Sequence, residues 1–74
     1  MIYNSELILG KSKPDKENFD VILYYFSEKE KTKIPNFIEI IGSYVFNNKL
    51  KCVEFEEDSK LRTIERYAFN IFKN

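Results

Sequence analysis

The chain has 74 residues, 43% of them hydrophobic and 16% aromatic, which provides for one small domain with a core and excludes a disordered tail. Twelve basic and twelve acidic residues cancel, so no net charge attracts nucleic acid or an anionic membrane. One cysteine and no histidine exclude a disulfide framework and remove the usual general base and metal ligand.

The segment 1–29 predicts a β-hairpin that leads into the rest of the chain. A short apolar run at 7–9 precedes a polar loop at 10–20, and the β-branched and aromatic run VILYYF at 21–26 favours a strand. The start of the chain has no signal-peptide pattern, and no apolar run approaches the roughly 20 residues that span a bilayer. We therefore expect no membrane insertion.

The segment 30–74 predicts about two repeated units, with a period of about 23 residues that lies within the range of leucine-rich repeats. The phrase IGSYVFNN at 41–48 returns as IERYAFNI at 64–71, with Ile, Tyr, Phe and Asn in register. Ahead of each phrase lies a predicted short strand, at 32–34 and at 51–55. One such unit cannot bury its own apolar face, so we expect the two units to stack, with Phe46 on Phe69.

The pattern IPNFIEIIGSYVFNN…LKCVEFEEDSKLRTIERYAFN resembles the BspA-type leucine-rich repeat of bacterial and protist surface antigens. The resemblance covers about half the chain. It implies a curved solenoid with strands on its inner face and short helical or irregular turns outside. It also implies protein or cell-surface recognition, adhesion and no catalysis, and a surface location rests on it alone. The sequence departs from the family in having no cysteine after Asn47 and no terminal cap after Phe72.

Three local patterns resemble chemical sites but lack the required spacing. Gly10-Lys11-Ser12 imitates the end of a phosphate-binding loop without its first glycine, and Pro14 disfavours the helix that should follow. The acidic residues around 54–58 lack the alternating ligands of a calcium loop. Cys52 has no histidine to activate it. We therefore predict no catalytic, cofactor-binding or metal site, and no enzyme.

The sequence thus predicts a β-rich α/β repeat fold, a short leucine-rich-repeat solenoid led by an N-terminal β-hairpin. The expected function is a protein-interaction or adhesion module with an unidentified protein partner, and with no nucleic acid. Outward-pointing strand residues would form its binding face: Lys31, Lys33, Cys52 and Glu54. The expected core comprises Val21, Leu23, Ile34, Ile38, Ile41, Phe46, Val53, Phe55, Leu61, Ile64 and Phe69.

Two alternatives remain open from the sequence. The segment LRTIERYAFNIF at 61–72 carries apolar residues at helical spacing and could form one amphipathic helix. The chain could also be a structural piece of a longer repeat array, with no activity of its own. It would then complete its core by self-association or by joining another polypeptide through an uncapped C-terminal end.

Overall fold

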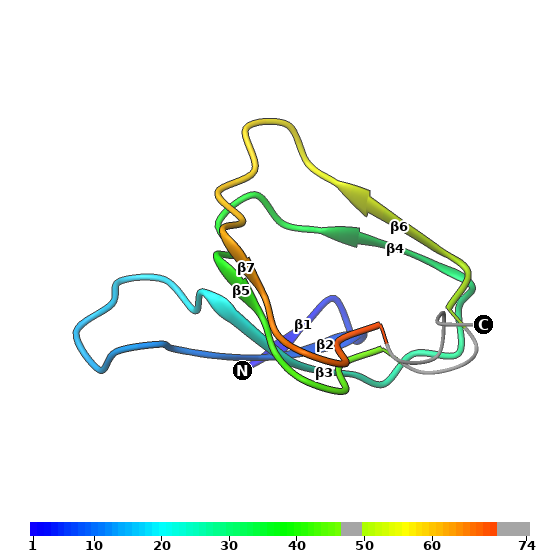
Figure 1. Ribbon diagram of the computed structural model, residues 1–74, viewed down its shortest axis with the longest axis horizontal. Helices are drawn as coiled ribbons and strands as arrows, with labels where there is room; N and C mark the ends of the chain where they lie inside the picture. Colours follow the sequence, from blue (N-terminus) through cyan, green and yellow to red (C-terminus); the bar gives the residue numbers. More distant parts are fainter. Residues whose placement is uncertain (47–49, 70–74) are drawn as a thin grey trace.

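The computed structural model describes residues 1–46 and 50–69, which form strands and turns and no helix. A mixed sheet contains five strands in the order β1-β2-β3-β5-β7, and a second, parallel sheet contains β4 and β6 (Figure 1). The strands are β1 Ile2–Tyr3, β2 Leu7–Gly10, β3 Val21–Tyr25, β4 Lys31–Ile34, β5 Ile40–Ile41, β6 Cys52–Phe55 and β7 Thr63–Ile64. The predicted α/β leucine-rich-repeat solenoid was therefore wrong, because the described residues provide two β-sheets and no helical turns.

An antiparallel meander forms the N-terminal part of the larger sheet. β2 pairs with β3 from Leu7↔Tyr25 to Gly10↔Val21, with a bulge between Ile8 and Leu9. β1 turns back onto β2 through Asn4 and Ser5, whose φ angles of 53° and 55° are typical of the tight turns that join twisted strands. The polar residues 11–20 connect β2 to β3, in the loop that extends from the body of the molecule in Figure 1.

The repeated phrases are brought side by side by parallel strand pairing. β5 pairs with β7, with Ile40 opposite Thr63 and Ile41 opposite Ile64. In the second sheet β4 pairs with β6, from Lys31↔Cys52 to Ile34↔Phe55. The second unit thus adds one strand to each sheet, and Figure 1 shows β6 beside β4 and β7 beside β5.

One apolar cluster joins the two sheets and the segments between them. The predicted core is confirmed at Ile34, Ile38, Ile41 and Phe46, and Val53, Leu61 and Phe69 pack against it while half-buried. Val21 was also predicted in the core, but it is half-buried and does not belong to this cluster. The buried members of the cluster are Leu7, Leu9, Ile22, Tyr25, Ile34, Ile38, Ile41, Val45, Phe46, Leu50 and Ala68.

Three residues predicted in the core are exposed instead. Leu23 is 52% exposed, because the register of β3 points Ile22 inward and Leu23 outward. Phe55 and Ile64 are 42% and 51% exposed because they stand on β6 and β7, the last strand of each sheet. Their strand partners Ile34 and Ile41, one strand further in, are fully buried.

The alternative of one helix over 61–72 was also wrong for its described part. Residues 63–64 form β7, and the turn that follows is closed by the Ala68 amide, which donates to the Glu65 carbonyl at 3.1 Å. Pairing of β7 with β5 satisfies backbone groups that a helix would have paired locally. The remainder of that segment, 70–72, lies outside the described residues.

Candidate functional site

The four predicted binding residues lie together on the exposed face of the β4–β6 sheet. Lys31 is opposite Cys52 and Lys33 is opposite Glu54, and all four side chains are exposed. Lys31 Nζ and Glu54 Oε2 are 3.1 Å apart, and the hydrogen bond from Lys31 to Glu54 raises the pKa of Lys31. Such an exposed pair contributes little to stability. A binding role for this face stays a prediction.

A groove of about 220 Å³ beside this face is lined by charged groups, several of which already have partners within the chain. Glu6 accepts hydrogen bonds from Thr32 Oγ1 at 2.8 Å and from Lys29 Nζ at 3.0 Å. Partial burial alone would raise the pKa of Glu6, but the hydrogen bonds from Lys29 and Thr32 outweigh it and hold that pKa below its usual value. Because the Glu6 carboxylate accepts hydrogen bonds from within the chain, it does not by itself indicate a ligand in this groove.

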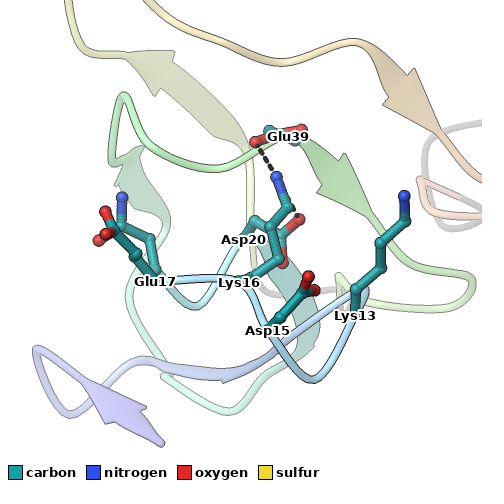
Figure 2. Close-up of a pocket in the computed structure, with 7 residues that line it drawn as sticks. Lys13, Asp15, Lys16, Glu17, Asp20 and Glu39 are labelled. Atoms are coloured by element: carbon teal, nitrogen blue, oxygen red, sulfur yellow. Dashed lines mark hydrogen bonds and ion pairs between the residues drawn. The ribbon is translucent and has the colours of Figure 1, made fainter.

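A second hollow, of about 440 Å³, lies beneath the loop 11–20 and is shown in Figure 2. Lys16 reaches from the loop to Glu39, with Nζ at 2.7 Å from Oε2, and lies 3.6 Å from Asp20 Oδ2. Asp20 also accepts hydrogen bonds from the amide and hydroxyl of Ser12. Among the described residues no buried side-chain nitrogen or oxygen lacks a partner. The charge network in this hollow therefore holds the loop 11–20 against Glu39, the residue before β5.

Arg62 extends this network into a ladder of alternating charge, Lys16–Glu39–Arg62. Lys16 pairs with Glu39, and Arg62 Nε donates to the other oxygen of the same carboxylate, Oε1, at 3.1 Å. The hydrogen bonds from Lys16 and then Arg62 hold the pKa of Glu39 below its usual value. This ladder was not predicted from the sequence, although its three charges are separated by the same spacing as the repeated phrases, a signal that could have found it.

The aromatic residues of the two phrases stack in the same way. The rings of Phe46 and Phe69 lie 4.7 Å apart at 18°, which confirms the predicted stacking, and those of Tyr44 and Tyr67 lie 5.4 Å apart at 19°. Both tyrosines have positive φ angles, 57° and 66°, a conformation uncommon outside glycine and asparagine. The two units therefore share backbone conformation as well as sequence.

The feature that stands out as a candidate site is the open end, which we define as β6, β7 and the exposed side chains of Phe55, Ile64 and Tyr67. β6 pairs only with β4 and β7 only with β5, so within the described residues each has one unpaired edge. Tyr67 is 46% exposed, and Phe55 and Ile64 occupy core-facing positions without a covering layer. Unpaired edges beside apolar side chains are competent to accept a further strand.

The open end was expected only in part from the sequence. An uncapped C-terminal end was predicted as one alternative, but Phe55 and Ile64 were assigned to the core, and the candidate site was placed on the face of β4 and β6. Which strand ends a sheet depends on pairing between segments far apart in the chain, and alternation within one strand does not reveal it.

The chain matches no protein-family model, no curated protein and no solved structure. The resemblance to BspA-type repeats thus stays a prediction, as does a surface location. Among the described residues, no group of acidic, cysteine or histidine side chains is placed to hold a metal ion. In the same part of the chain, no helix has the length and apolar character needed to cross a membrane.

Proposed function

We propose that this chain is a protein-interaction module that binds an extended segment of its partner at the open end. The observation that carries the proposal is the coincidence of two unpaired strand edges with three exposed apolar side chains at one end of the molecule. In strand addition, main-chain hydrogen bonds at such an edge supply affinity, and contacts with alternate side chains supply specificity. The proposal assigns the chain no catalytic step.

The chain itself illustrates how such an edge is filled. β6 occupies the edge of β4 through a parallel ladder, and Glu54 of the added strand forms an ion pair with Lys31. β7 occupies the edge of β5 in the same way, and Arg62 next to it pairs with Glu39. A partner segment that repeats these contacts at the open end would be extended and would cover Phe55 and Ile64.

Selection from a displayed library of random peptides tests the proposal. Peptides selected on the wild-type chain are then measured against Ile64→Lys, which places a charge at the open end, and against Ile2→Lys. Ile2 is also an exposed isoleucine, on β1 at the opposite edge of the same sheet, so it is a matched control. Because both side chains are largely exposed, we expect both variants to fold, which thermal denaturation by circular dichroism checks.

The expected result is binding to the wild-type chain and to Ile2→Lys with similar Kd, and at least about tenfold weaker binding to Ile64→Lys. Peptides that bind all three proteins alike would place the interaction elsewhere. Failure to select any binder would contradict the proposal.

A structural role is the second candidate function. Phe55 and Ile64 stand opposite Ile34 and Ile41 in their strand pairs, but Ile34 and Ile41 are fully buried whereas Phe55 and Ile64 are exposed. Two positions equivalent to core positions are therefore left uncovered, which favours a structural role. In that role the end would serve only to complete the fold with another chain, and no separate ligand would be bound. Circular dichroism through a dilution series separates the two, because a purely structural end predicts loss of β-signal on dilution.

A further inference from the structure

The open end carries opposite charges along its two sides. Residues 51–59, which contain β6 and the turn after it, have four acidic residues and one lysine. Residues 60–69, which contain β7 and its flanks, have three basic residues and one glutamate. Glu54 and Arg62 already pair within the chain, and the exposed charges Glu57 and Asp58 on one side and Lys60 and Arg66 on the other remain to face a partner. A surface that is acidic on one side and basic on the other is complementary to itself when it is rotated by half a turn.

A two-fold axis that runs between the two edges places β6 of one copy beside β7 of the other, twice. Acidic residues then face basic residues at both contacts, as a self-complementary two-fold interface requires. The other two-fold arrangement sets β6 against β6 and brings like charges together, which is unfavourable. The same half-turn would set Phe55, on β6 of each copy, against the β7 side of the other copy, where Ile64 and Tyr67 lie.

We propose that the open end is covered by a second copy of this chain, in a two-fold dimer that pairs β6 of each copy with β7 of the other. This inference rests on the proposed function and names the partner. Within one chain, opposite charges already pair across neighbouring segments, in the ladder Lys16–Glu39–Arg62 and in the pair Lys31–Glu54 between β4 and β6. The net charge of zero imposes no overall repulsion between copies.

The opposite edge of the larger sheet, at β1, offers a second arrangement. β1 is two residues long, as β7 is, and the turn at Asn4 and Ser5 follows it at once. A head-to-tail contact between β7 and β1 would also repeat without closing and would yield polymers rather than a dimer. The stoichiometry of the assembly therefore distinguishes the two arrangements.

Sedimentation-velocity ultracentrifugation with light scattering, from about 1 to 100 µM protein, tests the proposal over a range typical of moderate affinities. The wild-type chain and Ile2→Lys should be dimers at the upper concentrations, and Ile64→Lys should be a monomer. A wild-type chain that is monomeric at about 100 µM, a dimer that survives Ile64→Lys, or open polymers would each overturn the dimer.

Charge reversals test the arrangement of the dimer. Glu57 and Arg66 are exposed and take no part in the ion pairs described above, so reversing them leaves those pairs intact. Glu57→Lys and Arg66→Glu should each weaken the dimer about three- to tenfold, and the double variant should return to within about threefold of wild type. Single reversals without effect, or a double variant weaker than both singles, would exclude the pairing of β6 with β7.

The peptide selection separates failure of the dimer from failure of the proposed function. A monomeric chain whose selected peptides lose affinity with Ile64→Lys would retain the open end as a binding site and refute only the second copy as its partner. A monomeric chain that selects no peptide would refute both.

Discussion

Asp20 is a fully buried carboxylate at the junction of the loop 11–20 and β3. Burial alone would raise its pKa, but the hydrogen bonds from the Ser12 hydroxyl and amide, aided by Lys16, hold that pKa below its usual value. The folded protein therefore favours the ionised form of Asp20. Because the loop closes over this carboxylate, the stability of the hairpin is coupled to its charge.

Replacing Asp20 by asparagine should lower the free energy of unfolding at pH 7 by about 1–3 kcal/mol, since one charged acceptor is lost and an amide is placed near Lys16. Asp15→Asn is the control, because Asp15 is an exposed carboxylate in the same loop. Urea denaturation of the three proteins measures the difference. Equal losses from both substitutions would show that Asp20 has no special role.

The sign of the pH dependence follows from the lowered pKa. The contribution of ionised Asp20 is complete above the unfolded pKa of about 3.9 and is lost as pH falls through the lower folded pKa. The stability gap between wild type and Asp20→Asn should therefore close as the pH is taken below about 4. A gap that stays constant between pH 7 and pH 3 would contradict this account.

At the scale of elements, the contact between β3 and the end of β5 leaves no room for a side chain. The amide of Gly42 donates to the Ile22 carbonyl at 2.9 Å, and a Cβ at Gly42 would lie 3.0 Å from the same oxygen. Gly10, on β2, is also crowded, but by Leu23 Cδ1 at 2.9 Å, which belongs to an exposed and rotatable side chain.

Gly42→Ala should therefore destabilise the chain by about 1–3 kcal/mol, because the backbone of a central strand cannot move aside. Gly10→Ala should change stability by no more than about 0.5 kcal/mol, because Leu23 can adopt another rotamer. Chemical denaturation of both variants provides the comparison. A larger loss at Gly10 than at Gly42 would contradict the assignment of the close contact.

How much of the fold could be predicted differs from element to element. The segments that became β2, β3 and β6 were recognised from apolar and alternating residues, since strands of this length are long enough to show a pattern. The segment that became β4 was recognised from Pro35, which favours extended backbone at Ile34. β1, β5 and β7 are two residues long and are defined by their pairing partners, so no local pattern marks them. The exposure of Leu23 follows from the register of β3, which alternation alone leaves ambiguous.

The candidate site was less predictable than the strands. Alternation along β4 and β6 correctly indicated that Lys31 and Glu54 face solvent, but exposure is common and carries little functional information. The open end depends on strand order, a property of the whole sheet. The fold class was mistaken because the helical turns expected outside the strands were inferred from a family resemblance and not from the residues.

At the scale of the whole molecule, strand order sets a gradient of protection against hydrogen exchange. β3 and β5 have paired neighbours on both sides, whereas β1 and β7 have one each. Amides of β3 and β5 should exchange slowest and those of β1 and β7 fastest in dilute protein. Exchange measured by mass spectrometry or NMR checks this, and a β1 as protected as β3 would contradict the order.

The same measurement at high protein concentration reports on association. If a second copy covers the open end, amides of β6 and β7 should become more protected as concentration rises, while those of β1 should not change. This selective change would be lost in Ile64→Lys.

The two units differ in the length of the segment that connects the strand of the smaller sheet to the strand of the larger sheet. This connecting segment is where insertions and deletions should be tolerated during evolution. Residues 35–39 connect β4 to β5, whereas the longer segment 56–62 connects β6 to β7 and contains Asp58 at a φ of 60°. The extra length leaves Arg62 in register with Glu39 and Tyr67 with Tyr44. Related chains should therefore vary in the length of this connecting segment. The number of residues from the paired charge, Glu39 or Arg62, to the stacked tyrosine, Tyr44 or Tyr67, should stay fixed.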